Sequence, residues 1–140
     1  MRIKTKQLIA LTCFVALLNS CAFTKHKETA ERAVEKFHRQ FNNGEFHDIY
    51  VQADEGFKRA TGGAEVIALF EAVRRKLGTV VNAKSTGWHV KATPGGTIVT
   101  LGYDVEFSEG KATEQFLFQV NKDKALLFNY NINSPLLITK

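Results

Sequence analysis

The sequence of 140 residues has few of the features that identify common functional classes. Its longest uncharged apolar run, Leu8 to Leu18, has eleven residues, whereas a helix needs about 20 to cross a bilayer. No two of the four histidines lie three or four residues apart, so a helical pair of zinc ligands is absent. A glycine-rich phosphate loop and a G-x-S-x-G motif are also missing. We therefore expect no transmembrane helix, metal site, cofactor or catalytic nucleophile.

The N-terminus has the layout of an export signal. Arg2, Lys4 and Lys6 form a basic segment, and the apolar run from Leu8 to Leu18 follows it. Small residues come next, as a cleavage site requires. This order is typical of a secretory signal peptide, and we expect residues 1–20 to be removed.

The residues at the end of this segment, Leu18-Asn19-Ser20-Cys21, resemble the lipobox of bacterial lipoprotein precursors. The resemblance implies that Cys21 becomes the first mature residue and carries acyl chains that anchor the protein to a membrane of the cell envelope. Ala22, rather than Asp, follows the cysteine, which in such proteins implies the periplasmic face of the outer membrane if the host has two membranes. The alternative is ordinary cleavage after Ala22, with Ser20 and Ala22 as the small residues.

Removal of the signal changes the cysteine count and the charge. Cys13 would leave with the signal, so the mature chain would hold one acylated cysteine and no internal disulfide or cysteine metal site. Because the signal contains three basic and no acidic residues, the formal charge falls from +5 to +2. This small excess gives no reason to expect a nucleic-acid partner. The remaining length suits one domain, with residues 21–27 as a short tether and residues 28–140 as the folded part.

The first half of the mature chain has helical periodicity. Thr29 is a candidate N-cap for a helix that ends near Gly44, and a shorter helix is expected over Glu45 to Ala53. Residues 54–63 are expected to form a loop or irregular turn, with the side chain of Phe57 directed toward the core. A third helix is expected from Ala64 to Leu77. The basic residues 74–76 in its last turn either interact favourably with the helix dipole or contact anionic lipid headgroups.

After Gly78 the pattern alternates between apolar and polar residues, which predicts four strands separated by short turns. The strands are expected over Thr79 to Thr93, Thr97 to Phe107, Lys111 to Asn121 and Ala125 to Asn133. Short turns imply hairpins and hence an antiparallel meander. One apolar and one polar face per strand implies a sheet covered on one side by the helices, with Phe116, Phe118 and Phe128 buried. Gly87 is a candidate bulge.

Helices followed by an antiparallel sheet give an α+β order. The segments NGEFHDIY (residues 43–50), RRKLG (residues 74–78) and EQFLFQVNKDKALLFNYNI (residues 114–132) resemble the NTF2-like/cystatin-like superfamily. More narrowly, they resemble small bacterial lipoproteins with the uncharacterised DUF4019-type domain. The resemblance implies N-terminal helices packed on a curled four-stranded antiparallel sheet that encloses a cone. Some members of the superfamily are isomerases or dehydratases that use Asp, His or Tyr within the cone.

Glu114 is the candidate for a functional acid. It shares strand parity with Phe116 and Phe118, so it is expected to point toward the apolar side, and parity makes Tyr103 and Tyr130 its nearest companions. A carboxylate in such a place can become a general acid or base. The alternative is an exposed Glu114 near the strand end, close to Lys111. His38 lies off the main apolar stripe and is expected either to be solvated or to lie at the edge of that stripe.

These observations favour binding over catalysis. The first expectation is a lipid-anchored binding or assembly module of the cell envelope, whose partner is an envelope protein or a second copy of the chain. The second is a pocket for a small apolar ligand that includes Glu114, Tyr103 and Tyr130. The third is a small isomerase or hydratase on the same scaffold, which is disfavoured because no cluster of acid and base groups is visible in the sequence.

Overall fold

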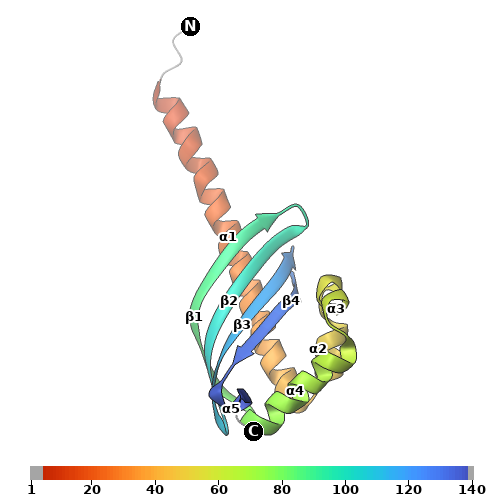
Figure 1. Cartoon of the computed structure of the whole chain (residues 1–140). Coiled ribbons are helices and arrows are strands. Elements are labelled where there is room, and N and C mark those ends of the chain that lie inside the picture. Colours follow the sequence, from red (N-terminus) through yellow and green to blue (C-terminus); the bar gives the residue numbers. More distant parts are fainter. Residues whose placement is uncertain (1–4, 139–140) are drawn as a thin grey trace.

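The computed structural model describes the backbone of residues 5–138 and the side chains of residues 21–138. Arg2 and Lys4 of the predicted basic segment lie outside that description, as do the side chains of Lys6 and of the apolar run. The described part contains α1 (Thr5–Asn43), α2 (Phe46–Val51), α3 (Glu55–Ala60), α4 (Gly63–Leu77) and α5 (Pro135–Ile138). Four strands, β1 (Val80–Thr93), β2 (Gly96–Phe107), β3 (Gly110–Asn121) and β4 (Lys124–Asn133), form one antiparallel sheet. The predicted α+β class is confirmed, and Figure 1 shows the sheet curving across one face of α1.

The sheet is a simple meander in the order β1-β2-β3-β4. All strand bounds lie within one residue of the prediction. Gly96 adopts a φ of 128° at the start of β2, a value that strongly favours glycine because it has no Cβ. The register of β1 against β2 shifts between Ser85 and Gly87, which confirms the bulge expected near Gly87. The sheet stays open, since β1 and β4 are its two edges.

Helix α1 begins far earlier than the Thr29 cap predicts. Thr29 lies inside the helix, and its hydroxyl donates a hydrogen bond of 2.9 Å to the carbonyl of Lys25 one turn earlier. The N-cap prediction is therefore wrong, because this side chain bonds back along the helix. The expected tether at residues 21–27 is likewise helical. Cys21, which is exposed, is thus held on a continuous helix that projects past the edge of the sheet (Figure 1).

The core lies between α1, α4 and the concave face of the sheet. Its large, fully buried side chains come from all three layers and include Phe41, Phe70, Phe116 and Leu101. Arg74 connects α4 to α1, since its Nη1 donates to the carbonyls of Phe41 and Asn42 at 2.9 and 2.7 Å. These carbonyls end α1 and have no partner within the helix. The role of Arg74 is therefore to cap α1, and its guanidinium is not free to meet lipid.

Two predictions fail near β4. The register of β3 against β4 shifts between Leu117 and Phe118, so Leu127 takes the inward position that alternation assigns to Phe128. Phe128 is 40% exposed and packs over Gly56. The expected loop at residues 54–63 contains α3, which Asp54 caps by accepting a 2.7 Å hydrogen bond from the Gly56 amide. Phe57 of α3 is buried as predicted.

Candidate functional site

A cleft of about 390 Å³ opens between α1, the α2–α3 segment and the start of β4. Its floor is apolar, because the buried side chains of Phe37, Ile49, Phe118 and Leu127 line it. The volume falls within the range of small-molecule sites, about 300–1,000 Å³. A concave apolar floor reached from three different elements is the general form of a ligand pocket.

The rim of the cleft is polar and carries a net positive charge. Lys36, Lys58 and Lys124 line it, and Glu55 is the one acid among the lining residues. The ammonium of Lys36 donates across the rim to the Gln52 side chain at 2.6 Å, while Lys58 pairs with Glu55 at 2.8 Å. Lys36 is thus held by a neutral amide and keeps its charge available. The cleft therefore suits an apolar molecule that bears an anionic group.

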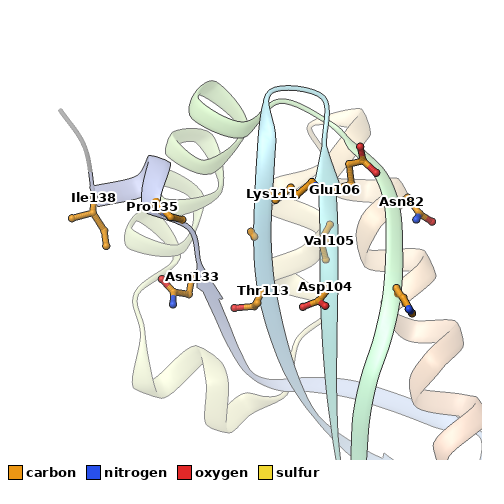
Figure 2. Close-up of a pocket in the computed structure, with 11 residues that line it drawn as sticks. Asn82, Asp104, Val105, Glu106, Lys111, Thr113, Asn133, Pro135 and Ile138 are labelled. Atoms are coloured by element: carbon orange, nitrogen blue, oxygen red, sulfur yellow. The ribbon is translucent and has the colours of Figure 1, made fainter.

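A second, wider hollow lies on the face of the sheet away from α1, with a volume of about 650 Å³. Figure 2 shows Asp104, Glu106, Lys111 and Thr113 on β2 and β3 at this hollow, with α5 at its border. Its charges stand opposite each other across strands, as Glu106 does with Lys111. Such pairs neutralise one another, so the charged side chains give this hollow no strong net field.

A buried polar cluster joins α1 to β3 and β4. The Tyr130 hydroxyl donates to Glu114 Oε1 at 2.6 Å, and His38 Nε2 lies 2.6 Å from Glu114 Oε2. Glu114 is 4% exposed and His38 9% exposed. Aromatic rings surround them, since Phe116 lies within 5.8 Å of the His38 ring and 5.2 Å of the Tyr130 ring, centroid to centroid. Both carboxylate oxygens are satisfied, which removes most of the cost of burying the acid.

The same surroundings hold two phenols in their protonated form. Burial raises the pKa of Tyr103 to about 12, and the carboxylates of Glu31, Glu35 and Glu114 add to the rise. Burial raises the pKa of Tyr130 well above its usual range, with further contributions from the charge and the hydrogen bond of Glu114. Tyr130 is therefore a permanent donor to Glu114 near neutral pH.

The structure brings together the three residues named from the sequence, since Tyr103 lies opposite Glu114 in the β2–β3 register and Tyr130 donates to Glu114, and it adds His38. Glu114 points inward as its parity predicts and contacts Tyr130, so the exposed alternative near Lys111 is wrong. Tyr103 is buried nearby, with its ring centroid 6.5 Å from that of His38. Of the two alternatives for His38, the solvated one is wrong, because His38 is buried beside Glu114. Sequence spacing alone could not find this contact, because it joins residues 76 positions apart.

The cluster and the cleft are separate. Neither His38 nor Tyr130 lines the cleft or any of three further hollows that the described residues form. Glu114 and Tyr103 line a hollow of about 460 Å³ on the outer face of the sheet. The described side chains also contain no group of three or more His, Cys, Asp or Glu residues arranged to hold a metal ion. The cleft is therefore reached by a ligand without passing through the His38–Glu114–Tyr130 contacts.

Comparison of the sequence with known protein families finds no match. A search of curated proteins finds no significantly similar sequence. Within the described residues, no helix combines the length and the apolar character needed to span a bilayer.

Proposed function

We propose that this protein is a lipid-anchored binding module of the cell envelope, and that its cleft holds a small apolar molecule with an anionic group. The observation that carries the binding role is the apolar cleft, with its floor of Phe37, Ile49, Phe118 and Leu127 and its lysine-rich rim. The lipobox-like residues Leu18 to Cys21 support the anchor. We also propose that the domain is NTF2-like/cystatin-like and related to the DUF4019-type lipoproteins, since a helix cradled by a curved antiparallel sheet agrees with the expected cone.

The position of Cys21 is compatible with acylation. Its side chain is exposed on α1, and Phe23 beside it is also exposed. Acyl chains on Cys21 would hold the whole domain, including the cleft, on one side of the bilayer. The outer membrane, facing the periplasm, remains the proposed address in a host with two membranes.

Filling part of the cleft should weaken ligand binding without unfolding the domain. Ala33 lines the cleft from α1, and Ala33→Leu adds three carbons to its apolar wall. We expect the affinity for anilinonaphthalene sulfonate, an apolar probe with one anionic group, to fall about tenfold, which corresponds to about 1.4 kcal/mol. A fluorescence titration of the purified full chain measures this.

Ala68→Leu is the matched control, because Ala68 is exposed on α4 and does not line the cleft. It should leave the affinity for the probe unchanged. Thermal unfolding of both variants checks that the fold is intact. If the probe binds both variants and the wild type equally, the cleft is not the binding site.

A second candidate function is acid–base catalysis, which the short contacts of Glu114 with His38 and Tyr130 favour. Against it, the Glu114 side chain is 1% exposed, and a general base must come within hydrogen-bond reach of its substrate. We therefore propose that the cluster is structural: it ties α1 to β3 and β4.

Glu114→Gln separates the two functions. Glutamine has the same shape, and its amide can accept from Tyr130 and donate to His38, so folding should survive. If the protein only binds, this variant should complement a deletion strain as well as Glu106→Gln, a matched change on the outer face of the sheet. Loss of complementation by Glu114→Gln alone, at normal abundance and localisation, would favour the enzyme.

A further inference from the structure

The positive charge of the mature chain is concentrated at one end of the domain. We call this end the anchor-side tip and define it as residues 21–28, 88–96 and 121–124. It contains five lysines and two acids; the lysines are Lys25, Lys27, Lys91, Lys122 and Lys124. From Cys21 to the C-terminus, the rest of the chain has eleven basic and twelve acidic residues. The net charge of the tip is therefore +3, whereas that of the remainder is −1.

The fold brings these three segments together. Thr97 of β2 pairs with Val120 of β3, so the β1–β2 and β3–β4 turns lie at the same end of the sheet, and a salt bridge of 2.8 Å joins Lys25 of α1 to Asp123 in the β3–β4 turn. In Figure 1, α1 leaves the sheet at this end. The tip is thus a single surface built around the emerging helix.

Three of the lysines are available for an outside partner. Lys25 is paired with Asp123, and Lys27 is paired with Glu31 at 2.8 Å and lies 5.6 Å from the centre of the Trp88 ring. Lys91, Lys122 and Lys124 are exposed and form no ion pair within the described part of the chain. Two exposed aromatic side chains, Phe23 and Trp88, stand among them, and Trp is enriched where proteins meet the membrane surface.

The tip also lies next to the proposed anchor. Lys25 is four residues from Cys21 on one helix, a rise of about 6 Å, which is shorter than the screening length of about 8 Å at physiological salt. Lysines this close to an anionic bilayer each contribute about 1 kcal/mol to binding. We propose that the anchor-side tip docks on a bilayer surface rich in anionic phospholipid. This inference rests on the proposed anchor for its geometry and adds a second membrane contact, which orients the domain.

Docking is tested on the mature chain, residues 21–140, with Cys21→Ser, which cannot be acylated, so that the tip is measured without the acyl anchor and without the signal segment. The probe is a vesicle of phosphatidylcholine alone or mixed with phosphatidylglycerol, and the readout is co-sedimentation. Lys91→Gln with Lys122→Asn should weaken binding to the anionic vesicles about 30-fold, or about fivefold for each lysine. Asparagine is chosen at position 122 because Lys122 has a φ of 55°, which Asn tolerates well.

Lys84→Gln with Lys111→Gln is the matched control, because it removes the same charge from the outer hollow near the opposite end of the sheet. It should change binding less than twofold, and all forms should bind phosphatidylcholine weakly. Equal losses in the two double variants would show that only net charge matters and would overturn the proposal. So would binding of the parent chain to DNA but not to anionic vesicles, which would assign the tip to a polyanion. Neither outcome bears on the proposed lipid anchor, because acylation of the wild-type protein is tested separately, by measuring its mass.

Discussion

Phe116→Ala should lower the free energy of unfolding by about 3–5 kcal/mol, the range for removing a large buried aromatic side chain. Phe116 is fully buried, and its ring contacts those of Phe37, Tyr103, Phe118 and Tyr130. Truncation would leave a cavity between α1 and the sheet and would loosen the ring contacts around His38 and Glu114. Urea unfolding of the variant, followed by far-UV circular dichroism, measures the change.

Phe128→Ala provides the control for this prediction. Simple alternation along β4 would bury Phe128 as deeply as Phe116, but the register shift turns it outward. Its truncation should therefore cost about 1 kcal/mol or less, in the range of surface changes. Equal losses for the two variants would mean that the bulge in β4 is misplaced and that Phe128 belongs to the core.

Cys21→Ser should abolish stable membrane anchoring. Each buried CH₂ of an acyl chain is worth about 0.8 kcal/mol, and two or more chains are needed for stable attachment. Serine has no thiol to form the thioether, so the variant should leave the membrane fraction or accumulate as the unprocessed precursor. Cell fractionation with mass determination of each form gives the result.

Cys13→Ser is the matched variant for this experiment, since it removes the other cysteine of the chain. If residues 1–20 are cleaved, this change is lost with the signal, and the mature protein should be identical to the wild type. A wild-type protein that begins at Phe23, without acyl chains and free of the membrane, would mean that Cys21 is not the anchor.

Much of the sheet could be predicted because local chemistry determines it. Gly96 has a positive φ at the β1–β2 turn, and short turn sequences mark where one strand ends and the next begins. The bulge in β4 could not be predicted, because no glycine or proline marks it. The extent of α1 was also hidden, since a threonine inside a helix has the same sequence signal as an N-cap.

The candidate site was less predictable than the fold. Strand parity was enough to point Glu114 inward and to place Tyr103 and Tyr130 on the same face of the sheet, but the register that brings them close to Glu114 could not be derived from parity. The contact with His38 depends on how α1 is rotated over the sheet, and helical periodicity does not determine that rotation. The cleft likewise depends on where α2 and α3 close over β4, and α3 itself had no clear helical signal.

The central claim is that a lipid-anchored domain holds a ligand in its cleft. Native mass spectrometry of the protein extracted from its own membranes tests this most directly. The account predicts a chain that begins at Cys21 and carries acyl chains, with a small molecule that dissociates on activation and is missing from Ala33→Leu. An unacylated chain without any bound molecule would contradict both parts of the account.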